Sequence, residues 1–145
     1  MGSSEHVHDL PIAVAADESL HAPHDVAVKA DLGYRCLALK PAGKTLSVAL
    51  LMAEEARKRD LACFVADSAC IPILVDWNKT FAARLPPFPG LDLGFMESNG
   101  AQNYTNWQAM LDDHPCNGAS WIGAHDGIFT LPDAFFARSG GIFDA

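Results

Sequence analysis

Four short apolar runs, each followed at once by a charged residue, limit what this chain can fold into. They cover residues 12–16, 36–39, 63–66 and 93–96, and the charged residues that follow them are Asp17 and Glu18, Lys40, Asp67, and Glu97. Amphipathic stretches typical of helices separate the runs, and one run plus one stretch is close to the ~30 residues of a β-α-β unit. The sequence therefore predicts an α/β fold of about four parallel strand–helix units.

The charged residues after these runs are the first candidates for a functional site. In parallel α/β folds all strands run the same way, so residues that follow their C-terminal ends meet at one edge, where active sites are built. We therefore expect Asp17, Lys40, Asp67 and Glu97 to lie close together around one site at this edge of the sheet.

Composition narrows the class of protein. The chain has 145 residues, half of them hydrophobic, which is enough for one domain with a buried core. Its formal charge of −8 argues against nonspecific binding to nucleic acid or to an anionic membrane.

No apolar stretch approaches the ~20 residues that span a bilayer. The start of the chain lacks the pattern of a secretory signal, so we expect a cytoplasmic protein. The four cysteines form no Cys-x-x-Cys pair and are expected to be reduced thiols.

The chain divides into three parts by pattern. Residues 1–11 are interpreted as a leader or a cut loop, residues 12–100 as the strand–helix region, and residues 101–145 as an irregular, aromatic clamp. Helices are expected at about 26–32, 45–60 and 72–85, with strands at 34–39, 61–66 and 91–96. Pro23-His24-Asp25 is expected to open the first helix and Gly33 to stop it. In the second helix, a stripe at positions 46, 49, 50, 53 and 56 is expected to face the core.

Lys40 is the strongest single candidate. A lysine at the half-buried end of a strand loses solvation, which tends to depress its pKa and can make it a base. The alternative is an ordinary lysine whose ammonium reaches out to pair with Glu18 or Asp17. Asp67 fits a helix cap and a functional role equally well, whereas Glu97 favours function.

Two further motifs are candidates for a functional role. Gly43-Lys44-Thr45 ends like a phosphate-binding loop. However, Ala38 stands where that motif needs its leading glycine, and Pro41 removes one amide from the cradle. A simple strand-to-helix turn is the preferred interpretation. His125-Asp126-Gly127 is interpreted as structural, because it lies beside a predicted turn in the clamp.

The order Ala-Asp-Glu-Ser after one strand, Leu-Lys-Pro after the next, then Val-Ala-Asp-Ser and Phe-Met-Glu-Ser resembles the C-terminal half of the catalytic barrel in the enolase superfamily. The resemblance is to the mandelate racemase and muconate lactonizing enzyme branch, and it covers roughly residues 12–100. It implies a partial, half TIM-type barrel: four strand–helix units where a complete (β/α)₈ barrel takes ~250 residues.

The resemblance also implies a chemistry and a set of roles. In that family Mg²⁺, held by three strand-end carboxylates, stabilises the enediolate formed when a proton is removed beside a substrate carboxylate. Asp17 would be the third metal ligand, Glu18 would orient Lys40, and Lys40 would be the acid/base group. Glu97 matches a catalytic carboxylate near the metal or the lysine. The expected reaction is that of an isomerase or lyase: epimerisation, cycloisomerisation or dehydration of a small carboxylate substrate.

The first two metal carboxylates and the opposite lysine base have no counterpart in the chain. Asp17 alone should not hold Mg²⁺, which needs about six oxygen ligands. We therefore expect a complementary barrel half or a second copy as partner. Two alternatives stand beside this hypothesis: a non-catalytic interaction domain that keeps the fold, and an open α/β domain that binds a phosphate ligand near Gly43-Lys44-Thr45.

Overall fold

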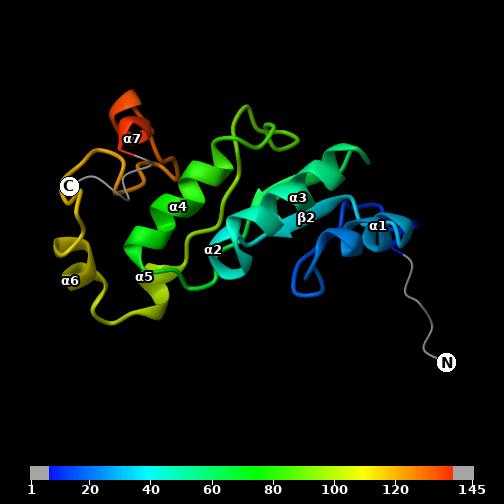
Figure 1. Ribbon diagram of the computed structural model, residues 1–145, viewed down its shortest axis with the longest axis horizontal. Coiled ribbons are helices and arrows are strands. Elements are labelled where there is room, and N and C mark those ends of the chain that lie inside the picture. Colours follow the sequence, from blue (N-terminus) through cyan, green and yellow to red (C-terminus); the bar gives the residue numbers. More distant parts are fainter. Residues whose placement is uncertain (1–6, 139–145) are drawn as a thin grey trace.

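The computed structural model describes residues 7–138 and has a mixed α/β architecture (Figure 1). Within this range a three-stranded parallel sheet is combined with seven helices. The strands are β1 (Ala15–Ala16), β2 (Cys36–Leu39) and β3 (Ala62–Val65). The helices are α1 (Pro23–Asp31), α2 (Pro41–Lys44), α3 (Leu46–Arg57), α4 (Pro72–Ala82), α5 (Gly100–Asn103), α6 (Trp107–Asp112) and α7 (Asp133–Ala137).

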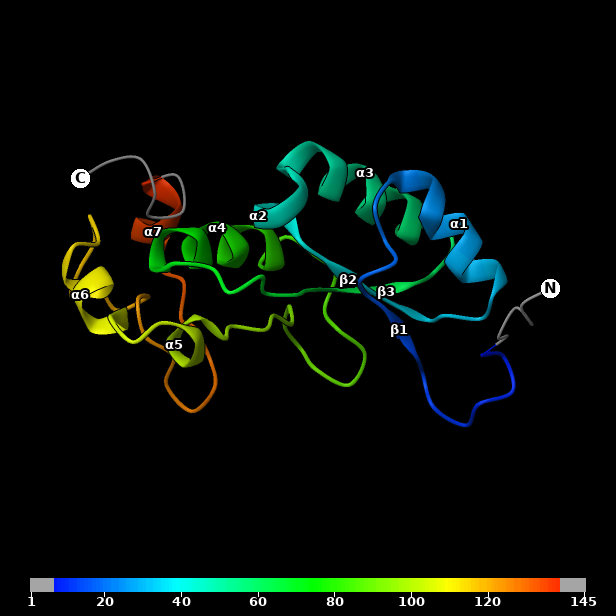
Figure 2. The same ribbon diagram turned by 90° about the horizontal axis from the view of Figure 1, so that it is seen from below.

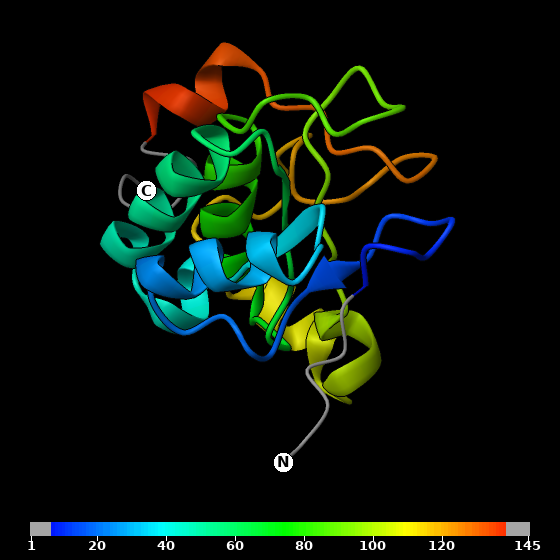
Figure 3. The same ribbon diagram turned by 90° about the vertical axis from the view of Figure 1, so that its right-hand side faces the viewer.

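The strands lie in chain order, β1-β2-β3, and all pair in parallel. Ala15 is opposite Cys36, and Leu39 is opposite Val65. Figures 2 and 3 show α1, α3 and α4 on one side of the sheet, with the loops that precede β1 and follow α4 largely on the other. The parallel α/β character predicted from the sequence is confirmed for β1, β2 and β3.

The first helix begins and ends where local chemistry favours it. Pro23 occupies its first turn, and the Asp25 carboxylate accepts the backbone N–H groups of His21 and Ala22 at 2.8 and 2.9 Å. Gly33 follows with φ +99°, a left-handed conformation that suits glycine and turns the chain toward β2. The stop predicted at Gly33 is therefore confirmed, although the helix begins earlier than expected.

The face that α3 turns to the sheet differs from the predicted stripe. Ala49, Met52 and Ala56 are buried in the main core, whereas Leu46 and Leu50 are exposed. Two of these three residues are alanines, which suits the packing of the helix against both the sheet and α1. The main core joins both layers and consists of Ala16, Leu20, Val26, Leu37, Leu39, Ala49, Met52, Ala56, Leu61, Val65, Phe81 and Ala82.

The fourth strand expected at 91–96 is reduced to one parallel bridge between Val65 and Met96. The N–H of Val65 donates to the Phe95 carbonyl, and the N–H of Glu97 donates to the Val65 carbonyl. Before that point the chain bonds to itself, because the Phe88 N–H donates to the Leu93 carbonyl and closes a turn. The rings of Phe64, Phe88 and Phe95 pack against one another at 5.3–6.0 Å between centroids and hold this turn beside β3.

The C-terminal part of the described chain packs on α4, away from the sheet (Figures 1 and 2). Its small core contains Cys116, Trp121 and Phe135. The Trp121 and Phe135 rings meet edge to face at 5.8 Å. No helix within residues 7–138 is both long and apolar enough to cross a membrane.

Gly94→Ala tests whether the segment before Met96 is fixed against α4. A Cβ at Gly94 would lie 2.2 Å from the Ala82 carbonyl oxygen, so backbone must move to admit it. We expect a loss of about 2–3 kcal/mol in the free energy of unfolding, measured by urea denaturation. Gly123→Ala is the matched control, because a Cβ there meets no atom within 4 Å and the change should stay within about 0.5 kcal/mol. Equal effects at both positions would contradict the packing of this segment.

Candidate functional site

Asp17, Glu18 and Lys40 meet at the carboxyl edge of the sheet. β1 ends directly before Asp17 and β2 directly before Lys40, so the β1–β2 pairing brings the two positions together. The Lys40 ammonium lies 2.8 Å from Asp17 Oδ1 and donates a hydrogen bond to Glu18 Oε1 at 2.5 Å. The Lys40 side chain is only 11% exposed, whereas Asp17 and Glu18 are 46% and 86% exposed. A largely buried ammonium is thus held by two carboxylates that reach solvent.

The pKa of Lys40 lies above its ordinary value, not below it as the sequence suggested. Desolvation lowers the pKa of Lys40, but the hydrogen bonds and charges of Asp17 and Glu18 together outweigh it. Lys40 is therefore an ammonium at neutral pH, so a role as proton donor or as a cationic contact fits it better than a role as free base. The ion pair with Asp17 and Glu18, the alternative considered for this lysine, is present.

Asp67 and Glu97 form a second group at the same edge, on the β3 side. Asp67 Oδ1 accepts the N–H groups of Ser68 and Cys70 at 2.7 and 2.9 Å, and its Oδ2 accepts the Asn99 N–H at 2.7 Å. Glu97 Oε2 accepts the Asp67 N–H at 3.1 Å. Both carboxylates are thus engaged in fixing the turns after β3 and after Met96. Neither forms an ion pair with Lys40, so the described structure does not join Glu97 to the lysine.

The segment after Lys40 forms a short helix, α2, where the sequence suggested a turn. The N–H groups of Gly43 and Lys44 both donate to the Lys40 carbonyl, at 3.1 and 2.9 Å. Thr45 Oγ1 accepts the Val48 N–H and caps α3. The two amides are used within the chain, so they are not free to donate to a phosphate as in a phosphate-binding loop.

The side chains at this edge do not by themselves fit a magnesium ion. Within residues 7–138, no group of three or more His, Cys, Asp or Glu side chains is arranged to hold a metal. Asp17, the ligand implied by the resemblance, already faces the Lys40 ammonium, whose charge opposes a cation at the same oxygen. Mg²⁺ prefers octahedral oxygen coordination, so further ligands would have to come from outside this part of the chain.

A buried charged cluster that sequence reasoning missed lies between α4 and the C-terminal part. The Lys79 ammonium is 2.7 Å from Asp76 Oδ1 and donates to the Trp121 carbonyl at 2.8 Å. His114 Nε2 lies 3.6 Å from Asp76 Oδ2, and the Phe129 ring centroid is 4.3 Å from the ammonium. All three charged or titratable side chains are at most 2% exposed. The Asp-x-x-Lys spacing within a predicted helix is a possible signal, but surface helices carry the same spacing.

Burial shifts the titration of this cluster. It raises the pKa of Asp76 and lowers the pKa of Lys79, each against the attraction of the other. Desolvation also lowers the pKa of His114, although Asp76 opposes the shift. His114 Nδ1 accepts the Cys116 N–H at 3.0 Å, which assigns the proton of the neutral ring to Nε2, facing Asp76. His114 is therefore neutral in this cluster, which joins α4 to the C-terminal part of the described chain.

The third candidate motif, His125-Asp126-Gly127, forms an exposed hairpin turn. His125 and Ile128 exchange both backbone hydrogen bonds at 2.9 Å, and Asp126 and Gly127 have φ of +51° and +78°. These are the conformations of a two-residue turn. The motif has the geometry expected of a structural element.

Comparison with known proteins gives no relative for this chain. No protein-family model matches it, and neither a curated protein nor a solved structure does. The resemblance to the enolase superfamily therefore stands on the residues quoted above.

Lys79→Met tests the buried joint between α4 and the C-terminal part. The substitution leaves Asp76 buried without its cationic partner, and we expect a loss of about 3–5 kcal/mol in the free energy of unfolding. Adding Asp76→Leu should recover part of that loss, because it removes the unpaired charge. Chemical denaturation of the two variants measures this difference. A double variant less stable than Lys79→Met would contradict the joint as described.

Stability should fall as pH drops below about 6.5, the ordinary pKa of histidine. Because burial lowers the pKa of His114 in the folded state, the unfolded chain binds that proton first. The contribution of His114 is thus intact above pH 6.5 and is lost as pH falls toward its folded pKa. Urea unfolding at pH 7.5 and 5.5 measures the change, which His114→Gln should reduce. His24→Gln, at an 80% exposed side chain, is the control, and an equal reduction there would contradict the assignment.

Proposed function

We propose that this chain carries the lysine-bearing half of an enolase-type acid–base site, on a half (β/α)₈ barrel of the mandelate racemase and muconate lactonizing enzyme branch. The observation that carries the proposal is the Lys40 ammonium, held between Asp17 and Glu18 at the carboxyl edge of a parallel sheet. The carboxyl edge is where parallel α/β enzymes place their chemistry. The raised pKa of Lys40 gives it a proton to donate at neutral pH.

The reaction class is proton transfer at the carbon next to a substrate carboxylate. A base on the far side of the substrate removes the α-proton, and the electron pair of the broken C–H bond moves into an enediolate. Lys40 donates its proton to the opposite face of that carbon and becomes a neutral amine, which completes an epimerisation. Before this step, its positive charge attracts the substrate carboxylate and stabilises the developing negative charge.

Asp17 and Glu18 are positioning residues in this proposal. Their carboxylates fix the ammonium and hold its pKa up, so that the proton is present before the substrate arrives. Glu97 does not contact Lys40. Its carboxylate accepts the Asp67 N–H and so fixes the turn after β3, at the same edge of the sheet. The opposite base and the oxygen ligands of a magnesium ion, when one is bound, are to be supplied by another polypeptide.

The exposed edge of the sheet supports a completing partner. β1 has no neighbour on its outer side within the described chain, and Ala15 on it is exposed. Leu10 and Ile12, just before β1, are 50% and 69% exposed. An open strand edge beside exposed apolar side chains invites pairing with another chain. We propose a complementary barrel half or a second copy as that partner.

A second candidate function, a non-catalytic interaction domain, is favoured by the same ion pair. Lys40 already neutralises the carboxylate that the resemblance assigns to a metal, so the edge is stable without any ligand. In that case the fold and its open edge would serve association alone.

Lys40→Met separates the two functions. We expect the purified chain, with Mg²⁺ present and at a concentration at which a second copy completes the site, to exchange the α-proton of one or more 2-hydroxy or 2-acylamino carboxylates in D₂O. Proton NMR of the substrate measures the exchange. Lys40→Met should slow it by about 10²–10⁴-fold, the usual contribution of a positioned acid or base.

Lys44→Met is the matched control, because Lys44 lies four residues after Lys40, at the end of the short helix α2, and makes no ion pair within residues 7–138. Its exchange rate should stay within about twofold of the wild-type rate, as expected for a side chain outside the proton transfer. An equal loss in both variants would contradict a specific role for Lys40. If the wild-type chain associates but exchanges no α-proton across the panel, the interaction domain is the better description.

A further inference from the structure

A long groove runs along the outward face of α3, from Leu46 to Arg57, and reaches the starts of the three strands. Its volume is about 1020 Å³, near the upper end of the range for small-molecule sites. The lining comes from the starts of β1, β2 and β3, from the outward face of α3, from the last turn of α4 and from the proline-rich segment 85–89. The proposed acid–base chemistry uses none of these residues, and only Ala15, on β1, also belongs to the strand edge proposed to pair with a partner.

The walls are mainly apolar, and the packing of the fold explains why. Because α3 turns Ala49 and Met52 to the core, its Leu46 and Leu50 face the groove instead. Phe81, Leu85 and Phe88 form the facing wall. An apolar body bound here would cover leucine side chains that are otherwise exposed to water.

The groove also contains an open stretch of strand edge. The N–H and C=O of Cys63 point away from β2, as do those of Val65 two residues later. The two groups of Val65 bond to Phe95 and Glu97, whereas those of Cys63 find no partner within residues 7–138. Cys63 lines the groove, and burial raises the pKa of its thiol to about 12, so the thiol stays neutral. The N–H of Cys63 is therefore free to donate a hydrogen bond to a molecule in the groove.

The charges on the rim favour an anion. Three of the five arginines of the chain, Arg35, Arg57 and Arg84, line the groove, against the two carboxylates of Glu54 and Asp60. Within the described chain Arg35 and Arg84 make no ion pair: their guanidinium groups donate to the backbone carbonyls of Tyr34 and Thr80. The Arg84 guanidinium also lies over the Phe136 ring, 5.1 Å from its centroid, a contact that leaves its charge without an acidic partner.

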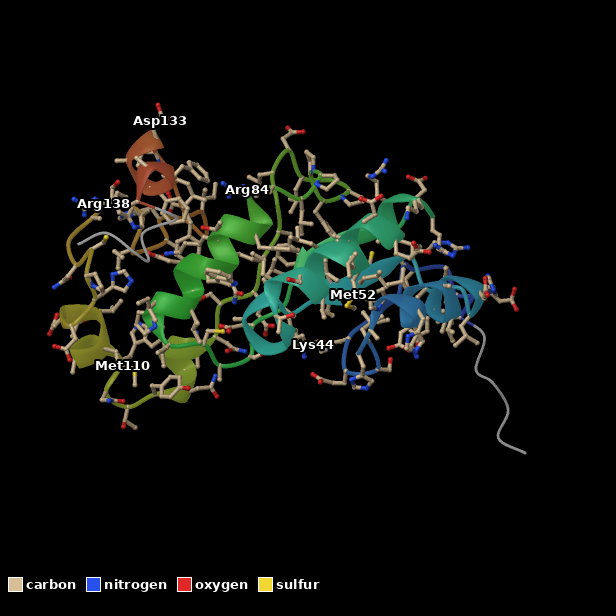
Figure 4. All side chains as sticks on the ribbon, viewed as in Figure 1. Lys44, Met52, Arg84, Met110, Asp133 and Arg138 are labelled. Carbon is tan, nitrogen blue, oxygen red and sulfur yellow. The ribbon has the colours of Figure 1, made fainter. Side chains whose placement is uncertain are left out.

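We propose that this groove binds an amphipathic organic anion, a carboxylate with a medium-length hydrocarbon body. The hydrocarbon lies along the leucine and phenylalanine walls, and the carboxylate is held by Arg35 and Arg84. Arginine suits this role, because its planar guanidinium can donate two parallel hydrogen bonds to a carboxylate. The lining of the groove includes none of Asp17, Glu18 and Lys40, so the groove and the proposed acid–base site share no side chain. Figure 4 shows Arg84 just beyond the end of α4.

Isothermal titration of the full chain with decanoate tests the proposal. We expect one decanoate per chain, bound at least about tenfold more tightly than decyltrimethylammonium or decanol, because charge-assisted contacts are lost with either. In ¹⁵N-resolved NMR spectra, decanoate should shift the amide signals of Cys63 and Phe64. Several molecules of decanoate per chain, or equal affinity for the three probes, would overturn the proposal, because either result indicates nonspecific binding to apolar surface.

The double variant Arg35→Met/Arg84→Met tests the anion contact itself. Methionine keeps the apolar length of the side chain and removes its charge, so decanoate affinity should fall by about tenfold or more while decanol affinity stays the same. Arg59→Met is the matched control. Arg59 lies two residues after the end of α3, pairs with Glu55 and does not line the groove. Its decanoate affinity should be unchanged. An equal loss in Arg59→Met, or no loss in the double variant, would overturn the role of Arg35 and Arg84.

Discussion

The parallel pairing of β1, β2 and β3 in chain order is the constraint on which the rest of this structure depends. Each connection between neighbouring parallel strands must cross from one end of the sheet to the other, and here a helix does so on the same face each time. All three carboxyl ends therefore lie at one edge and all three amino ends at the other. The lysine site lies at the carboxyl edge, and the strand residues that line the arginine-rimmed groove come mainly from the amino ends.

Two lysines illustrate how surroundings decide what one side chain does. Lys40 is 11% exposed and faces two carboxylates, so its pKa rises and its charge is available at the surface. Lys79 is 2% exposed and faces one carboxylate and a backbone carbonyl, so burial lowers its pKa. The first suits contact with a ligand. The second suits a joint that holds the C-terminal part of the described chain on α4, where removing either partner is costly.

Local signals predicted much of the strand–helix region. Pro23 and Gly33 mark the two ends of the first helix, Pro72 begins α4, and the apolar run 61–66 contains β3. The contact of Asp17 and Glu18 with Lys40 also followed from the sequence, because parallel neighbours bring consecutive strand ends together. These predictions succeeded where a few adjacent residues and one pairing rule decide the outcome.

Other features depended on packing between segments distant in the chain. The rotation of α3 depends on how closely it packs on the sheet and α1, and the loss of the fourth strand depends on the aromatic cluster of Phe64, Phe88 and Phe95. The cluster of Asp76, Lys79 and His114 joins residues up to 38 positions apart, so no local period announces it.

The sequence by itself determined the order of β1, α1, β2, α3, β3 and α4 and the charged residues that follow the strands, since both follow from local hydrophobic patterning. Only the tertiary structure decided that Lys40 is a paired ammonium, that Glu97 binds a turn, and that a groove opens along the outward face of α3. Charge state, contact and cavity shape depend on the surroundings that other segments provide.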